Sequence, residues 1–182
     1  NPTISVGFLL FWSTMTSFAD LTTIGVGGPI AIFLEPTSRV GVIEAVEDAD
    51  AKGLPLCVIG GGSNMLVADT PFNGVVVRDA RRSINVLDEA APVENGERIV
   101  HVNAEAGCNW DDFVDFCVEL GLEGVEGLSG IPGTVGGGVY MNAGAYGGEI
   151  KDVLACATFL DETGAERTLQ AGELQLGYRT SV

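Results

Sequence analysis

Short runs of apolar residues, separated by polar and glycine-containing turns, make up most of the chain and indicate strands. The run Leu56–Ile59 contains no polar residue, which predicts a strand buried on both faces. Pro36 ends another run, because proline cannot donate to a strand ladder. Strands are predicted at 31–36, 56–59, 65–67, 75–77, 84–86, 99–104, 155–160 and 166–169, the last four as two pairs around polar turns.

Two longer stretches show helical spacing. The first begins at Thr37 or Ser38, whose side chains suit a helix cap, and ends before Gly53. The second begins at Asn109 and ends at Gly121. Its expected core side carries Trp110, Phe113, Val114, Cys117 and Val118. The mixture of short strands with two helices predicts an α+β fold.

Composition narrows the function classes. The formal net charge is −16 with only nine Lys and Arg, so nucleic acid and anionic membranes are not expected partners. One histidine, His101, and no Cys cluster give no metal site. The four cysteines, none in a C-x-x-C pair, predict buried free thiols in a reducing cytoplasmic compartment: Cys57, Cys108, Cys117 and Cys156. A phosphate ligand stays possible, since backbone N–H groups bind anions.

The first candidate site is the glycine cluster directly after the run Leu56–Ile59. It consists of Gly60, Gly61, Gly62, Ser63 and Asn64. Consecutive N–H groups in such a turn form an anion nest, and the missing side chains let a ligand approach the backbone. No Gly-Lys-Ser/Thr follows, which excludes a Walker A loop, and a predicted strand rather than a helix follows, which excludes the Rossmann fingerprint. A purely structural turn is the alternative.

The second candidate is the most glycine-rich segment, 130–147. An extended backbone of this length with few side chains is costly in folding entropy, and a flat ligand lying against it would offset that cost. A mobile loop is the alternative, although it would expose Val135, Val139, Tyr140 and Met141 in a row. The candidate ligand contacts are Gly130, Ile131, Pro132, Gly133, Thr134, Gly136, Gly137, Asn142, Gly144 and Tyr146.

The third candidate is Gly177-Tyr178-Arg179-Thr180-Ser181. The guanidinium of Arg179 is a forked donor suited to a carboxylate or a phosphate. With Leu21–Pro29, these segments in this order resemble the UDP-N-acetylenolpyruvoylglucosamine reductase (MurB) family, and the resemblance covers residues 17–182.

The resemblance implies the two-lobed FAD-binding fold of the vanillyl-alcohol-oxidase (PCMH) type, with lobes at 17–70 and 71–182. It implies that 60–64 binds the FAD pyrophosphate and that 130–137 and 142–147 lie beside the flavin ring. NADPH would reduce the flavin, which would then reduce the enolpyruvyl group of a UDP-sugar to give UDP-N-acetylmuramate for peptidoglycan. Arg179 matches the catalytic arginine, and Tyr178 would help to position the substrate.

Two features depart from the family pattern. The proton donor of the family lies in a later domain and is not matched by Ser181, so we expect this chain to be a fragment that lacks the substrate-binding domain and is inactive alone. We treat residues 1–16 as an N-terminal extension, expect residues 1–14 of it to be upstream or misassigned sequence that ends before Met15, and expect the full-length protein to be monomeric. The alternatives are a flavin oxidoreductase of this fold with another substrate, and a non-catalytic acidic interaction module.

Overall fold

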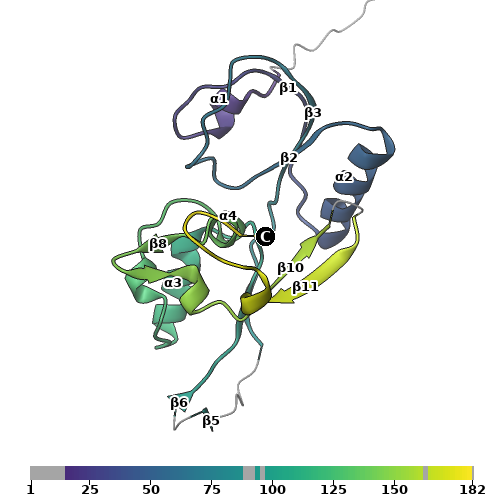
Figure 1. Ribbon diagram of the computed structural model, residues 1–182. Helices are drawn as coiled ribbons and strands as arrows, with labels where there is room; N and C mark the ends of the chain where they lie inside the picture. The colour runs from purple at the N-terminus through teal and green to yellow at the C-terminus, as the bar shows by residue number, and fades with distance from the viewer. Residues whose placement is uncertain (1–14, 88–92, 95–96, 162–163, 182) are drawn as a thin grey trace, which may run out of the picture.

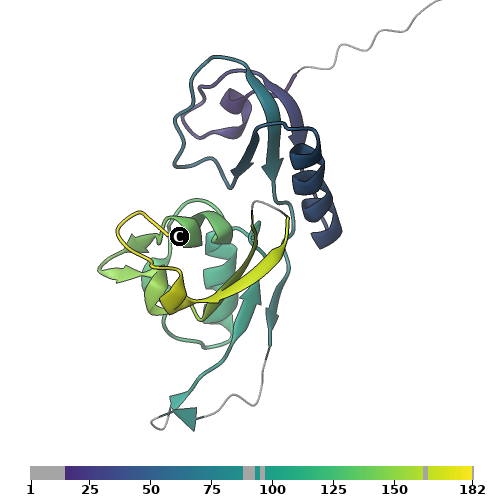
Figure 2. The same cartoon turned by 45° about the vertical axis from the view of Figure 1, so that its right-hand side comes forward.

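The computed structural model describes residues 15–87, 93–94, 97–161 and 164–181. The apolar run at 6–12 and most of the expected N-terminal extension lie outside these residues. Figures 1 and 2 show two lobes stacked on one another, joined by the chain that continues from β3 (Phe72–Arg78). The elements mix short helices with short strands, as the sequence pattern predicts.

The first lobe is built on a three-stranded parallel sheet. Its strand order is β1 (Ile30–Leu34), β3, β2 (Leu56–Ile59), and both outer strands pair with β3. The helix α2 (Arg39–Ala51) covers one face of this sheet and the short α1 (Phe18–Leu21) packs on the other. Because β3 is central, its residues Val75, Val76 and Val77 are all buried.

The sheet revises three expectations. β2 is an edge strand, and Val58 is 65% exposed, so the prediction of burial on both faces is wrong. Residues 65–67 form no strand, because that part of the chain loops past Gly28, whose N–H donates to Ala68 O. Since β3 belongs to the first sheet, we place the end of the first lobe after residue 78 rather than after residue 70.

Ser38 is confirmed as the cap of α2, since its Oγ accepts from Gly41 N at 3.1 Å. Asn109 is confirmed as the cap of α3 (Trp110–Glu119), where its Oδ1 accepts from the N–H groups of Asp111 and Asp112. α3 ends before Gly121, which has a φ of 71°.

The second lobe packs small elements around one face of α3. Trp110 is buried at the centre, and its Nε1 donates to Leu128 O at 2.8 Å. Val118, expected in this core, is 50% exposed on the far side of the helix. The other strands that the structure describes form four two-stranded pairs: β4 (Ile84–Val86) with β7 (Val102–Ala104), β5 (Val93–Glu94) with β6 (Glu97–Arg98), β8 (Gly144–Ala145) with β9 (Gly148–Glu149), and β10 (Cys156–Leu160) with β11 (Glu166–Gln170). The other helices are α4 (Val135–Tyr140) and the short 3-10 helices η1 (Glu126–Leu128), η2 (Ile150–Asp152) and η3 (Ala171–Glu173).

The hairpin β10–β11 connects the second lobe to α2 of the first. Arg39 on α2 forms an ion pair of 2.6 Å with Glu166 on β11. A β-carbon added to Gly164, near the hairpin turn, would lie 3.2 Å from Glu47 of α2. These contacts join the two lobes in addition to the contact between the glycine loops.

All four cysteines are free thiols. Cys108 and Cys117 are buried as expected, whereas Cys156 lies on a hairpin strand with an open edge and is exposed. Burial raises the pKa of the Cys57, Cys108 and Cys117 thiols, which keeps them protonated. No helix in the described ranges has both the length and the apolar character that a membrane span requires.

Replacing Trp110 by Phe tests the centre of the second lobe. The change leaves the buried Leu128 carbonyl without its donor and opens a cavity, so we expect a loss of about 2–4 kcal/mol in the free energy of unfolding. Urea denaturation measures it. Val118→Ala on the same helix is the matched control and should stay within about 0.5 kcal/mol. Equal losses in both variants would contradict this account of the core.

Candidate functional site

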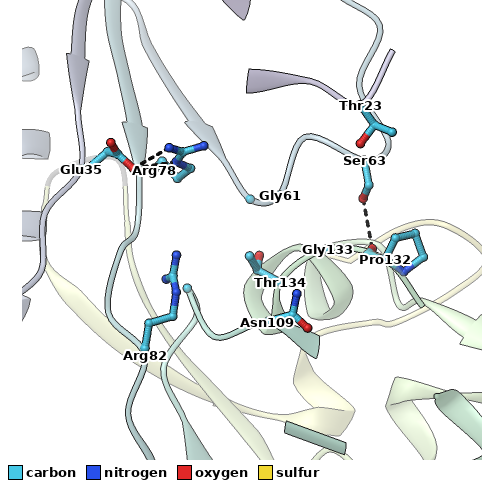
Figure 3. A pocket seen from close by; sticks show the side chains of 12 residues that line it. Thr23, Glu35, Gly61, Ser63, Arg78, Arg82, Asn109, Pro132, Gly133 and Thr134 are labelled. Carbon is cyan, nitrogen blue, oxygen red and sulfur yellow. Dashed lines mark hydrogen bonds and ion pairs between the residues drawn. The ribbon is translucent and has the colours of Figure 1, made fainter. Parts of the chain in front are cut away.

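The glycine loops that the sequence singles out come together between the two lobes. Ser63 Oγ in the first loop donates to Pro132 O in the second at 3.0 Å (Figure 3). A β-carbon added to Gly61 would lie 3.0 Å from Gly133 Cα, so the two backbones are nearly in contact. The absence of side chains thus permits the lobes to approach at this point.

The first loop needs glycine for a second reason. Gly62 has a φ of +69°, and a β-carbon there would lie 1.9 Å from Leu21 O. The carbonyl of Gly62 accepts from Thr23 N at 3.1 Å, which fastens the loop to the segment after α1. The loop is therefore held from the side of its own lobe as well as from the opposite one.

The second loop is not the extended backbone that its composition predicts. Thr134 caps the short helix α4, accepting from Gly137 N at 3.3 Å. The glycines of α4 allow close packing, since a β-carbon on Gly136 would lie 2.8 Å from Ala106 Cβ, and one on Gly138 2.8 Å from Ile150 Cδ1. Part of this glycine run therefore serves helix packing rather than a ligand surface.

The segment just before α4 is tied to the start of α3. Trp110 N donates to Gly133 O at 3.0 Å, and Val135 N donates to Cys108 O at 2.9 Å. Val135 and Val139 pack against the core around Trp110. These two residues are therefore not left exposed, as they would be in a mobile loop. Tyr140 is exposed, in contrast.

A cleft of about 390 Å³ lies where the loops meet. Six of the residues predicted from the sequence line it: Gly60, Gly61, Ser63, Pro132, Gly133 and Thr134. Six further lining residues were missed: Thr23, Glu35, Arg78, Arg82, Gly107 and Asn109. The missed residues come from several separate segments of both lobes, and the packing of the lobes brings them to one cleft.

The backbone of both loops offers hydrogen-bond donors at the cleft. Among the described residues, the N–H groups of Gly61, Ser63, Gly133 and Thr134 have no acceptor within the protein. Such groups are expected to be satisfied, by water or by a ligand. Together with the hydroxyl groups of the lining residues, they form a donor set suited to an anionic ligand.

The third motif lies against the other two. Arg179 Nη2 donates to Asn64 Oδ1 at 2.9 Å, which places the guanidinium beside the first glycine loop. Ser181 Oγ donates to Tyr140 O at 2.8 Å, at the end of α4. Arg179 itself has a φ of 55°, so its side chain is presented from a sharp turn between Gly177 and Thr180.

The side chain of Asn142 holds this turn in place. Its side chain is 4% exposed, and its Nδ2 donates to Gly177 O at 3.1 Å and to Glu149 Oε2 at 2.8 Å. Its Oδ1 accepts from Lys151 N at 3.0 Å. Lys151 also forms an ion pair with Glu149, and the hydrogen bonds from Lys151 and then Asn142 lower the pKa of the Glu149 carboxyl.

The other predicted residues have varied surroundings. Gly130 N donates to Asp111 Oδ1 at 2.7 Å, Ile131 packs against the core, and Gly144 pairs with Glu149 in the β8–β9 hairpin. Tyr146 is 96% exposed and Tyr178 is 87% exposed. Large aromatic surfaces with this exposure are available to a ligand or to another domain.

Residues 29–170 match the family model of the FAD binding domain. The chain belongs to this family. Its fold is the FAD-binding fold of the PCMH type, as two solved structures confirm. The MurB reductase of Thermus caldophilus is 33% identical with a TM-score of 0.69, and the match covers 91% of this chain and 55% of that one. The fold of 6-hydroxy-D-nicotine oxidase of Arthrobacter nicotinovorans matches at 21% identity with a TM-score of 0.63, over 86% of this chain and 33% of that one.

Curated relatives of this FAD binding domain share one name. UDP-N-acetylenolpyruvoylglucosamine reductase of Thermobifida fusca is 43% identical over 166 residues, which are 90% of this chain and 45% of the relative. The protein of that name from Saccharopolyspora erythraea is 44% identical over 168 residues, 92% of this chain and 44% of the relative. The chain thus spans about half the length of the curated relatives it matches.

Two glycines with similar backbone angles test the first loop. Gly25→Ala is strained only by its φ of +73°, because nothing lies within 4 Å of the added carbon, and we expect it to cost about 1 kcal/mol. Gly62→Ala adds a clash with Leu21 O, and we expect about 1–3 kcal/mol more, with weaker FAD binding. Chemical denaturation and FAD titration measure both effects, and equal results in the two variants would contradict the packing argument.

The Glu149 carboxylate should make the Arg179 turn sensitive to acid. Its pKa is lowered in the folded protein, so its contribution is complete above its ordinary value of 4.5 and is lost as pH falls through the folded pKa. We expect the wild-type thermal midpoint to exceed that of Glu149→Gln at about pH 6 and the difference to shrink as the pH falls below 4.5 and through the folded pKa. A difference independent of pH would exclude an ionic role for Glu149.

Proposed function

We propose that this chain is the FAD-binding part of a cytoplasmic UDP-N-acetylenolpyruvoylglucosamine reductase. The enzyme would use NADPH to reduce the enolpyruvyl group of UDP-N-acetylglucosamine enolpyruvate, giving UDP-N-acetylmuramate for peptidoglycan. The observation that carries the proposal is the hydrogen bond from Arg179 to Asn64, the last residue of a glycine loop that lines the cleft. Similarity to reductases of this name over most of the chain supports the same assignment.

The residues of the cleft fit the anionic centre of a dinucleotide. Gly61, Ser63, Gly133 and Thr134 would direct their unsatisfied N–H groups at the pyrophosphate, and the hydroxyl of Thr23 would add a donor from the rim. When bound, FAD would supply hydride transfer. The chain as a whole is strongly acidic, and such neutral donors bind an anion without requiring a cluster of basic side chains.

Arg179 would act on the substrate. Within the described residues its guanidinium has no carboxylate partner, so its charge is available to the carboxylate of the enolpyruvyl group. There it would orient the substrate and stabilise the negative charge that develops as the double bond is reduced. Tyr178, next to it and exposed, would cover the substrate on the same side. Asn142 would serve mainly to hold the turn, since both of its amide N–H groups are used within the protein.

The first test is cofactor binding by the chain itself. Purified protein mixed with FAD and freed of excess ligand should be yellow, with the absorption spectrum of a bound flavin. A colourless protein that cannot be reconstituted with FAD would refute the proposal and favour a non-catalytic interaction module.

The second test separates the two half-reactions in a reductase that also carries the remaining domains of the relatives. Arg179→Ala should slow oxidation of the reduced flavin by the enolpyruvyl substrate by about 100-fold or more, because an electrostatic contact to developing charge is lost. Reduction by NADPH should change little, and Arg167→Ala, remote on β11, should change neither. Stopped-flow absorbance follows both steps, and equal slowing of both would argue against this role for Arg179.

A further inference from the structure

Most of the Lys and Arg side chains that the structure describes are neutralised by a carboxylate. Arg39, Lys52, Arg78, Arg81, Lys151 and Arg167 all form ion pairs. Among the described Lys and Arg side chains, only Arg82 and Arg179 have no carboxylate within ion-pair distance. In a chain of net charge −16, an unpaired cation is unusual, and its position indicates where an external anion is accommodated.

Arg82 lines the cleft and is held there by the backbone. Its Nη1 donates to Asp79 O and to Arg81 O, both at 2.9 Å. Figure 3 shows its side chain reaching from the lower side of the cleft toward the space between Arg78 and Thr134. Carbonyl oxygens fix the guanidinium without cancelling its charge, so the group is preorganised and still cationic.

Gly107 makes room for this arrangement. A β-carbon there would lie 2.3 Å from Arg82 Nη1, and also 2.2 Å from Asp79 O. Any larger residue would displace the guanidinium from its two carbonyl acceptors. The glycine, the carbonyls and the arginine therefore form one built unit at the cleft wall.

The neighbouring arginines show the contrast. Arg78 lines the same cleft, but its Nη2 lies 2.6 Å from Glu35 Oε1, and its guanidinium stacks 5.3 Å from the centre of the Phe33 ring. Arg81 is paired with Asp79 and Glu105. Of these three arginines, Arg82 alone offers an uncompensated charge to the cleft among the described residues.

We propose that Arg82 binds a phosphate oxygen of the dinucleotide in this cleft through its remaining Nε and Nη2 donors. The inference rests on the proposed function, namely that the cleft binds FAD. Arg82 then complements the neutral backbone donors of the loops with the one fixed charge at the phosphate. It determines affinity for the dinucleotide and takes no part in the reduction itself.

The test compares the FAD affinity of Arg82→Gln with that of Arg167→Gln. Arg167→Gln is the control, because it removes an arginine of β11 that is paired with Asp161. We expect Arg82→Gln to weaken FAD binding about 10- to 100-fold, because a charge-assisted hydrogen bond is lost. It should also flatten the dependence of log Kd on log salt concentration. Arg82→Lys should fall between wild type and Gln, and the control should match wild type.

A second measurement needs no variant. Phenylglyoxal modifies exposed arginines, and mass spectrometry locates the adducts. FAD should protect Arg82 in the wild-type chain and leave Arg167 as reactive as before. This result decides the matter if Arg82→Gln does not fold.

The outcomes are distinguishable. A wild-type chain that fails to bind FAD overturns the proposed function, and this inference with it. If the wild type binds FAD, the inference alone is overturned by an unchanged affinity of Arg82→Gln, by a weakened affinity with an unchanged salt dependence, or by phenylglyoxal labelling of Arg82 that FAD does not reduce.

Discussion

The close approach of two backbones, at Gly61 in the first lobe and Gly133 in the second, is the constraint on which the remaining structure depends. A β-carbon at Gly61 would press on Gly133 Cα at 3.0 Å, and one at Gly133 would lie 3.1 Å from Ser63 Oγ, the donor of the hydrogen bond to Pro132. The cleft, the unsatisfied N–H groups and the position of Asn64 beside Arg179 all depend on that approach. The ion pair between Arg39 and Glu166 connects the lobes on another side, but it is exposed and contributes little by itself.

Electrostatics would decide which ligands the proposed FAD cleft retains. A surface with an excess of carboxylates repels anions at long range, so an anionic ligand is retained only where local donors outweigh that field. Backbone N–H groups supply such donors without altering the net charge of the protein. Most arginines that the structure describes are paired with carboxylates, so few other surface sites compete for an anionic ligand. The cations that stay unpaired can then act at defined positions.

Local patterns in the sequence predicted local structure well. The caps Ser38 and Asn109, the strand Leu56–Ile59 and the pairing of β10 with β11 follow from residue type and spacing. Long-range packing could not be predicted in the same way. The exposure of Val58 depends on which strand is central in the sheet, and no periodicity in four residues reveals that.

The candidate site shows the same contrast between local sequence patterns and long-range packing. The glycine loops could be recognised because a run without side chains is unusual in itself. Arg82 could not, since its importance depends on two carbonyl acceptors and on Gly107, which is 25 residues away in the sequence and carries no distinctive neighbours. Glycine composition also misled in one place: the segment around Gly136 predicted an extended ligand surface, whereas the helix α4 uses these glycines to pack against Ala106 and Ile150.

Backbone strain is concentrated around the Arg179 turn. Asn142, Tyr146, Gln175 and Arg179 are the non-glycine residues with positive φ in the described part of the chain, and each such residue costs on the order of 1 kcal/mol. Strain of this kind persists only where surrounding contacts determine the geometry. Asn142 supplies those contacts, because its buried amide joins Gly177 to the Glu149–Lys151 pair. The guanidinium of Arg179 is therefore oriented by the FAD-binding lobes themselves, before any substrate is bound, and the entropy of ordering it is already lost on folding.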